Sequence, residues 1–126
     1  MKNRIKLTIL IIQIFLLVSF NAHSVDDFNF DVTEIEITEK GNKFKGFNRG
    51  KIKTNNGIII DADEFIYEKI SNILNAKGNV KIYDEINDYT IFTEHITYLK
   101  NQEKLLTKGY SKAFSDDVII ESQKFI

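Results

Sequence analysis

Residues 62–84 read ADEFIYEKISNILNAKGNVKIYD, and this stretch decides the fold. Its apolar residues recur mostly at every second position, which is the spacing of a half-buried β-strand rather than of a helix. The breaks between the apolar runs contain Ser, Asn and Gly, residues that tolerate the backbone of tight turns. We therefore predict short strands at 64–68, 73–76 and 80–83, with turns at 70–72 and 77–79.

The same alternation continues toward the N-terminus. No segment after residue 25 keeps an apolar stripe of helical spacing for three turns. Many short strands separated by tight turns are typical of an all-β fold built as a meander. The further strands predicted here lie at 33–38, 43–47, 51–53 and 58–60, with turns at 39–42 and 54–57.

The chain also repeats itself, because residues 63–67 (DEFIY) correspond to residues 94–98 (EHITY) without a gap. At the same shift, residues 74–78 (LNAKG) correspond to residues 105–109 (LLTKG). A single unit of this size cannot bury its apolar face alone, so neighbouring units are expected to pack against each other.

A third unit begins at Val118, where VIIESQKFI matches IIIDADEFI at residues 58–66. The sequence ends inside this unit. We therefore predict that the domain at 25–126 is incomplete at its C-terminus, and that residues 118–126 form a strand with an unpaired edge.

The apolar residues change side within each unit. Ile58 and Ile60 occupy even positions, whereas Phe65 and Tyr67 occupy odd positions. A strand that bends from one sheet into a second sheet changes its inward face in this way. The fold class predicted is therefore all-β, with two small antiparallel sheets that face each other across apolar side chains.

Two pieces of the repeat, ADxxxY from Ala62 to Tyr67 and AKGNV from Ala76 to Val80, resemble the unit of a known family. This is the OstA-like domain of the LptA family of lipopolysaccharide-transport proteins, and the resemblance covers residues 30–126. The resemblance implies a V-shaped β-jelly roll whose groove shields the acyl chains of lipopolysaccharide. It also implies that domains join end to end by strand pairing.

Within the family, the opening FDVTEIEI from Phe30 is most similar to the N-terminal periplasmic domain of the outer-membrane assembly protein LptD. That resemblance implies a function in lipopolysaccharide assembly at the outer membrane, with a membrane β-barrel encoded downstream as a further partner. A free-standing LptA-like bridge component of the periplasm is the alternative.

The resemblance implies that the inward apolar side chains line a lipid groove. The residues themselves are also consistent with an ordinary packed core. The predicted groove residues are Ile60, Phe65, Tyr67, Leu74, Val80, Ile82, Ile91, Ile96, Tyr98 and Leu105. In the second unit Ser111, Thr107 and Ala113 stand where the first unit has Val80, Ala76 and Ile82, which predicts a smaller and more polar lining that leaves room there.

The predicted docking edge is the first strand, which would pair with an LptA-like periplasmic bridge protein by β-augmentation. Its residues are Val32, Thr33, Ile35 and Ile37. Downstream of it lies a local run of basic residues in a chain that is mildly acidic after residue 24. We interpret this run mainly as a solvated strand face, with contact to lipid phosphates as the alternative; it comprises Lys40, Lys43, Lys45, Arg49, Lys51 and Lys53.

Residues 1–24 have the layout of a secretory signal peptide. Three basic residues precede an apolar run at 7–20, and the small residues Ala22 and Ser24 would permit cleavage before Val25. We predict export to the periplasm or the outer membrane. If the leader is not cleaved, the chain would instead be an LptC-like component anchored in the inner membrane.

The composition excludes several kinds of site. The chain has no Cys and two His, which excludes a thiol nucleophile or a disulfide framework and disfavours a metal centre. A net charge of −1 disfavours nucleic-acid binding. The acidic group of Asp61, Asp63 and Glu64 is interpreted as solvated rather than as a calcium site. We predict no catalytic residue, metal or cofactor; an exported polysaccharide-binding or enzymatic β-domain would need aromatic platforms or paired carboxylates that the sequence does not suggest.

Overall fold

The computed structural model describes residues 28–126, and the predicted signal peptide at 1–24 lies outside these residues. Within the described part, most of the chain is β-strand, and the only helices are two single turns of 3-10 helix. No helix in this part is long and apolar enough to cross a membrane. The elements are β1 (Phe28–Thr38), η1 (Glu39–Gly41), β2 (Lys43–Thr54), β3 (Ile58–Ala62), β4 (Glu64–Glu68), β5 (Ile73–Asp84), β6 (Tyr89–Leu99), η2 (Lys100–Gln102), β7 (Lys104–Lys108), β8 (Ser111–Ser115) and β9 (Val118–Ser122).

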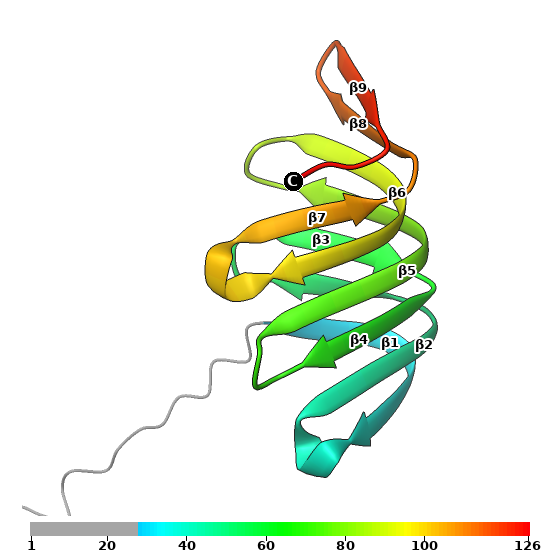
Figure 1. The fold of residues 1–126 in the computed structure, drawn as a ribbon, viewed down its shortest axis with the longest axis vertical. Coiled ribbons are helices and arrows are strands. Elements are labelled where there is room, and N and C mark those ends of the chain that lie inside the picture. The colour runs from blue at the N-terminus through cyan, green and yellow to red at the C-terminus, as the bar shows by residue number, and fades with distance from the viewer. Residues whose placement is uncertain (1–27) are drawn as a thin grey trace, which may run out of the picture.

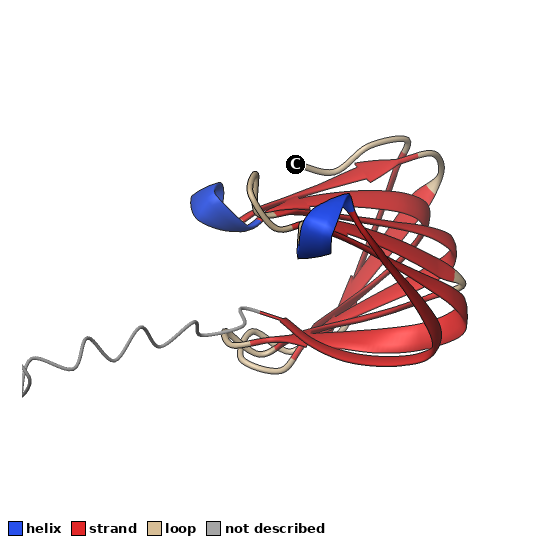
Figure 2. Cartoon of the chain, turned by 90° about the horizontal axis from the view of Figure 1, so that it is seen from below, coloured by secondary structure: helices blue, strands red, loops and turns tan. Residues whose placement is uncertain are grey.

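The nine strands form one antiparallel sheet with the order β1-β2-β3-β5-β6-β8-β9. The short strands β4 and β7 lie off this path, because β4 pairs with β2 and β5 while β7 pairs with β6. The all-β, antiparallel prediction is confirmed. The two facing layers exist, but they are two arms of a single sheet that folds over on itself (Figures 1 and 2).

The long strands β2, β5 and β6 connect the arms, since each of them pairs with different short strands along its two halves. In β5, residues 73–77 pair with β4 and residues 81–84 pair with β3. We call the arm that contains β3, β8 and β9 the first arm, and the arm that contains β4 and β7 the second arm. Figure 2 shows the strands curving from one arm into the other at a common corner.

The corner coincides with irregular backbone at the middle of β2 and β5. In β2, Asn48 and Arg49 have φ angles of 59° and 63°. In β5, Gly78 and Asn79 have φ angles of 80° and 46°, and the register with β6 shifts at this point. A bulge of this kind bends a strand without ending it.

This corner corrects two of our predictions. The predicted turn at 77–79 is a bulge inside the continuous strand β5, so the strands predicted at 73–76 and 80–83 are one strand. Likewise, the strands predicted at 43–47 and 51–53 are both parts of β2. Glycine and asparagine provide left-handed backbone for a turn and for a bulge alike, which is why the local sequence did not distinguish them.

The sequence repeat corresponds to a structural repeat. At a shift of 31 positions (94 − 63), β4 falls on the second half of β6, and β3 falls on its first half. The two halves of β5 fall on β7 and β8. The difference between the units lies in which strand is continuous across the corner, because the first unit has a continuous β5 and the second a continuous β6.

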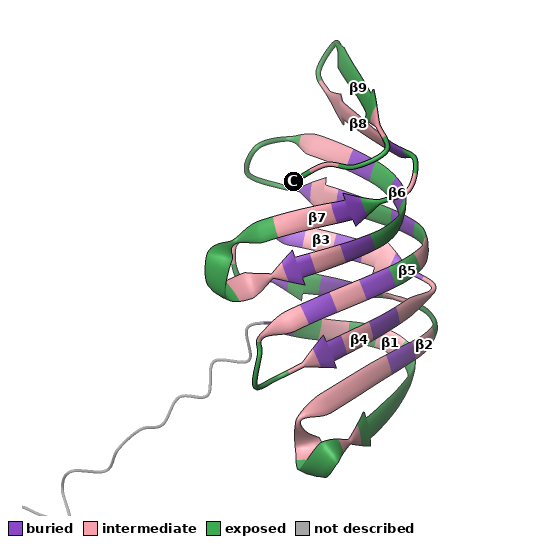
Figure 3. Ribbon diagram, viewed as in Figure 1, coloured by how far each residue is buried: buried purple, intermediate pink, exposed green. Residues whose placement is uncertain are grey.

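The core lies between the two arms. The burial of the strands alternates in β3, β4 and most of β5, so that every second side chain is enclosed (Figure 3). Aromatic rings concentrate where β1, β2 and β4 come together: the ring centroids of Phe30 and Phe44 lie 6.0 Å apart and those of Phe28 and Tyr67 lie 4.7 Å apart. Aromatic pairs at such distances add to the free energy of ordinary apolar burial.

The third unit is shorter than predicted. The strand β9 ends at Ser122, where the side chain hydroxyl donates to the Lys124 carbonyl oxygen at 2.8 Å and accepts from the Lys124 N–H at 3.2 Å. A local hydrogen bond of this kind competes with strand continuation. The tail then reaches β7, where the Thr107 N–H donates to the Phe125 carbonyl oxygen at 3.0 Å and the Phe125 N–H donates to the Thr107 hydroxyl at 2.7 Å.

Candidate functional site

The predicted groove residues all lie on the inner faces of the two arms. Nine of them are buried, and Leu105 is half-buried against the same cluster. The first arm contributes Ile60, Val80, Ile82 and Ile91, and the second arm contributes Phe65, Tyr67, Leu74, Ile96, Tyr98 and Leu105. The structure therefore brings the ten residues together as one packed apolar interior, and their contact with lipid stays a prediction.

The arms meet again at the mouth, which is the side away from the corner. The ring of Phe28, at the start of β1, lies 4.7 Å from Tyr67 and 6.1 Å from Tyr98 between centroids. From the turn after β2, Asn56 Nδ2 donates to the hydroxyl of Tyr98 at 3.1 Å. These contacts join the first arm to the second, so any opening of the interior from this side has to separate them.

The predicted groove residues did not include Phe28 or Asn56. The alternation of Phe28 and Phe30 is a signal that could have extended the first strand backward to include Phe28. No local signal exists for Asn56, because its partner Tyr98 lies 42 positions away.

The interior of the second unit is polar, as Thr107 and Ser111 predicted. The Ser111 hydroxyl lies 2.9 Å from the Thr93 hydroxyl and 3.0 Å from that of Thr107, and all three side chains are buried. The three hydroxyls hydrogen bond to one another, and the Thr107 hydroxyl also accepts from the Phe125 N–H, so these buried polar groups have partners within the protein. The tail packs here as well, with Phe125 against the buried core.

The predicted docking edge is an edge strand of the sheet. Among the described residues β1 pairs only with β2, so its other side is unpaired. Ile35 and Ile37 are 48% and 56% exposed, Thr33 is exposed as well, and Val32 is half-buried against the core. An edge with exposed apolar side chains is a surface on which another strand can pair.

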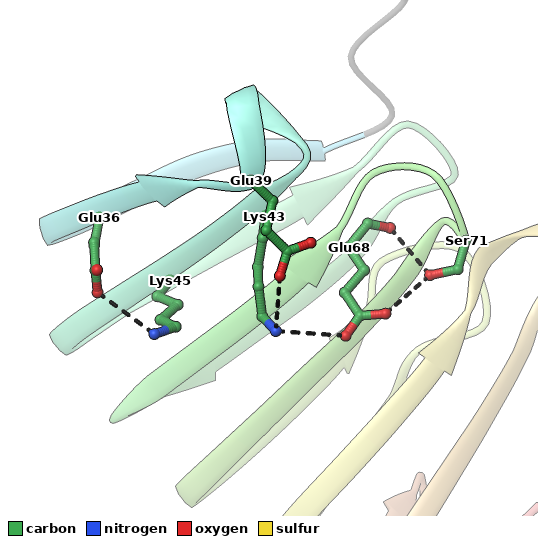
Figure 4. A network of polar contacts seen from close by, with 6 residues as sticks. All are labelled: Glu36, Glu39, Lys43, Lys45, Glu68 and Ser71. Atoms are coloured by element: carbon green, nitrogen blue, oxygen red, sulfur yellow. Dashed lines mark hydrogen bonds and ion pairs between the residues drawn. The ribbon is translucent and has the colours of Figure 1, made fainter.

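The basic run that follows β1 is largely neutralised by acidic neighbours. Lys43 Nζ lies 3.6 Å from Glu39 and 4.0 Å from Glu68, and Lys45 Nζ lies 3.6 Å from Glu36 (Figure 4). In the same network the Ser71 hydroxyl donates to Glu68 Oε2 at 3.2 Å. These contacts support the interpretation of the run as a solvated strand face.

Two acidic residues at the corner, Asp61 and Asp63, form ion pairs with Arg49. Arg49 Nη2 lies 2.9 Å from Asp61 Oδ1, and Arg49 Nη1 lies 2.8 Å from Asp63 Oδ1. Hydrogen bonds from Asn79 and then from Arg49 hold the pKa of Asp63 below its ordinary value. Within residues 28–126, no three His, Cys, Asp or Glu side chains gather as a metal site would require.

Comparisons with known proteins bear on the fold. No family model and no curated protein sequence matches the chain. Seven chains among the solved structures match its fold. One of them is LptH from Pseudomonas aeruginosa, described as the LptA homologous periplasmic component of the conserved lipopolysaccharide transport device. The TM-score is 0.69 at 10% sequence identity, and the match covers 77% of this chain and 72% of that chain. The predicted LptA-like β-jelly roll is thereby confirmed as the fold of residues 28–126.

Proposed function

We propose that this chain takes part in lipopolysaccharide transport as a non-enzymatic module that shields acyl chains between its two arms. The observation that carries the proposal is the LptA-like fold itself, whose arms are joined by the corner and enclose an apolar interior. Burial of an acyl chain gains about 0.8 kcal/mol per methylene, so an interior of this kind can hold a lipid once it opens.

Opening at the mouth is the step that loading requires. The contacts that close the mouth include the edge-on contacts of Phe28 with Tyr67 and Tyr98 and the hydrogen bond between Asn56 and Tyr98. The corner, in contrast, is crossed by the continuous strands β2, β5 and β6. We infer that the arms spread at the mouth while the corner stays intact.

The test places a photoreactive amino acid at Leu105, which lies on the inner face of β7 and is half-buried. We expect crosslinking to purified lipopolysaccharide from this position. The matched control is Phe92, an exposed apolar residue of β6 next to the buried Ile91 and therefore on the opposite face. Equal crosslinking from both positions, or none from Leu105, would contradict transport through the interior.

We further propose that β1 docks to an LptA-like partner by strand pairing. The free edge and the exposed Ile35 and Ile37 support this. In the variant Ile35→Pro the strand loses a backbone N–H and accepts a neighbouring strand poorly, so partner binding is expected to fall at least tenfold. Ile35→Thr keeps the N–H and the β-branched shape and is expected to bind normally; unchanged binding by the proline variant would reject β1 as the docking edge.

We propose two alternative positions for this module in the transport system. The resemblance from Phe30 onward supports the N-terminal domain of an LptD-type protein at the outer membrane, while the likeness to LptH supports an LptA-like bridge in the periplasm. Immunoblots of separated membranes and periplasm from the native organism discriminate between them. A much larger band in the outer membrane favours the first, and a small periplasmic band the second.

The predicted leader is tested on the same material. N-terminal sequencing that begins at Val25 would establish a cleaved signal peptide. An intact leader in the inner-membrane fraction would instead favour the LptC-like alternative.

A further inference from the structure

The outer face of the second arm contains a hollow of about 550 Å³, whose lining shares only Phe65 and Ile96 with the ten predicted groove residues. Volumes of 300–1,000 Å³ are typical of sites for small ligands. The hollow extends across β4, β5, β6 and β7 to the C-terminal tail. The residues that matter for its chemistry are Glu64, Ile66, Lys77, His95, Leu106 and Lys108.

The register of the strands shows why a trough forms here. One outward row consists of Ile66, Asn75, Thr97 and Leu106, which are cross-strand partners. Two positions along each strand, a second outward row consists of Glu64, Lys77, His95 and Lys108. The row between them is Phe65, Ala76, Ile96 and Thr107, which is buried and points into the interior. The trough is therefore the space between two rows of outward side chains, with the sheet as its floor.

The dimensions of the trough suit one extended chain. It crosses four strands and continues to Gln123 and Lys124 of the tail, which hydrogen bonds to the free edge of β7. At about 4.8 Å between neighbouring strands, four intervals give a length of roughly 19 Å. Its width is set by two residues along a strand, or about 6.8 Å.

The two long sides of the trough differ in charge. The row that begins at Ile66 carries no charge. In the other row, Lys77 pairs with Glu64 at 2.9 Å, which uses the one acidic side chain of the lining. Within residues 28–126, Lys108 and Lys124 have no carboxylate within ion-pair distance, so two cationic groups at the β7 end are available to a ligand.

The floor of the trough distinguishes between two kinds of extended ligand. The middle strands β5 and β6 are paired on both sides, so the floor offers no unpaired backbone to a peptide. A polymethylene chain needs no backbone hydrogen bonds, and it gains from contact with Ile66, Leu106 and the stems of the lysines.

We propose that this trough binds a long-chain fatty-acid anion, with the alkyl chain lying across β4–β7 and the carboxylate at Lys108 and Lys124. The proposal does not depend on lipopolysaccharide entering the interior. It assigns a second lipid site to the opposite face of the same arm.

The test exploits two adjacent leucines of β7. Leu105 faces the interior and Leu106 faces the trough, and both are half-buried. Binding of tetradecanoate to the described domain is measured by displacement of a fluorescent fatty-acid probe. We expect Leu106→Gln to weaken binding about tenfold, since a buried leucine contact is replaced by a polar group, and Leu105→Gln to leave it unchanged.

The contribution of the lysine charge is tested by comparing tetradecanoate with its uncharged analogue 1-tetradecanol. Lys108→Gln is expected to weaken tetradecanoate binding several-fold, with a smaller effect at high salt, and to leave 1-tetradecanol binding unchanged. Folding of every variant is verified by its circular dichroism and urea midpoint. Loss on Leu105→Gln but not on Leu106→Gln would place the fatty acid in the interior and overturn the trough site.

Two other results would also reject the proposal: no tetradecanoate binding by the wild-type chain, or displacement of the probe by an acidic peptide and not by tetradecanoate. A negative result for the trough does not bear on the transport proposal, because transport through the interior is tested separately by lipopolysaccharide crosslinking at Leu105.

Discussion

At the scale of single residues, the buried carboxylate of Asp84 organises the turn between β5 and β6. Its Oδ1 accepts the N–H groups of Ile86 and Asn87, each at 2.9 Å, and its Oδ2 accepts from Asn87 Nδ2 at 2.8 Å. Burial raises the pKa of Asp84, but hydrogen bonds from Asn87, Ile86 and Tyr89 outweigh it and hold the pKa below its ordinary value. Asp84 therefore stabilises the fold in its ionised form.

This makes the stability contributed by Asp84 dependent on pH. The unfolded pKa is about 3.9, and the folded pKa is lower, so the contribution is fully present above the unfolded value and is lost as the pH falls through the folded value. We expect Asp84→Ala to reduce the free energy of unfolding at pH 7 by about 1–3 kcal/mol. Urea denaturation should show this difference narrowing below about pH 4.

The control for this prediction is Glu85→Ala in the same turn. Glu85 is exposed and pairs with Lys53 at 2.8 Å, and an exposed ion pair contributes little. If Glu85→Ala cost as much as Asp84→Ala, or if the Asp84→Ala deficit were independent of pH, the role assigned to Asp84 would be wrong.

Residues of the interior could be predicted from the sequence because alternation is a local property. Ile60, Phe65 and Leu74 each lie in a short segment whose apolar residues recur at every second position, and each is buried. The contacts that close the mouth could not be predicted in this way. Asn56 reaches Tyr98 only because the sheet folds over and brings a turn of one arm to a strand of the other.

At the scale of elements, the fit between β1 and β2 depends on Gly50 at the corner. A Cβ at this position would lie 2.6 Å from Val32 Cγ1 and 2.7 Å from the Asp31 carbonyl oxygen. The carbonyl belongs to the backbone and cannot rotate away, so Gly50→Ala forces β1 outward. We expect a loss of about 1–3 kcal/mol and faster amide hydrogen exchange confined to β1.

Gly46 provides the comparison, because it faces the same side chain from the same strand. Its added Cβ would lie 3.2 Å from Val32 Cγ1, which is a side-chain atom that can shift slightly. Gly46→Ala should therefore change exchange in β1 less than Gly50→Ala does. The reverse order would show that β1 is not held by close backbone approach at the corner.

The strands themselves were predictable as elements, but their continuity was not. The sequence KGN at 77–79 is equally suited to a turn and to a bulge. The structure selects the bulge, since the Asp63 N–H donates to the Gly78 carbonyl oxygen at 3.0 Å and Asn79 Nδ2 donates to Asp63 at 2.7 Å. Both contacts involve Asp63, which lies between β3 and β4, so the sequence around Gly78 alone does not determine the outcome.

At the scale of the whole molecule, the sheet ends in two strands that are each paired on one side only. In the described residues β1 pairs only with β2, and β9 pairs only with β8. The repeat predicted the unpaired edge at the second end, since one unit needs a neighbour to cover it. It did not predict that the tail after Ser122 would leave β9 for β7, because that contact depends on the buried hydroxyl of Thr107.

The exposed end at β9 leads to a prediction about self-association. Val118, Ile119 and Ile120 are 56%, 58% and 53% exposed, in contiguous positions on an edge strand. Such an edge is a site for pairing between chains, and a lysine on it opposes that pairing. We expect the domain at 28–126 to associate increasingly with concentration in sedimentation velocity, and Ile119→Lys to keep it monomeric over the same range.

The control variant Phe92→Lys distinguishes strand pairing at the β9 edge from nonspecific association through exposed apolar side chains. Phe92 is a similarly exposed apolar residue (45%), but it lies on β6, whose two sides are paired with other strands. Edge pairing predicts that Phe92→Lys associates like the wild-type chain. If Phe92→Lys suppressed association as strongly as Ile119→Lys, exposed apolar area rather than the free edge of β9 would drive the association. The edge would then be tested with the variant Ile120→Pro.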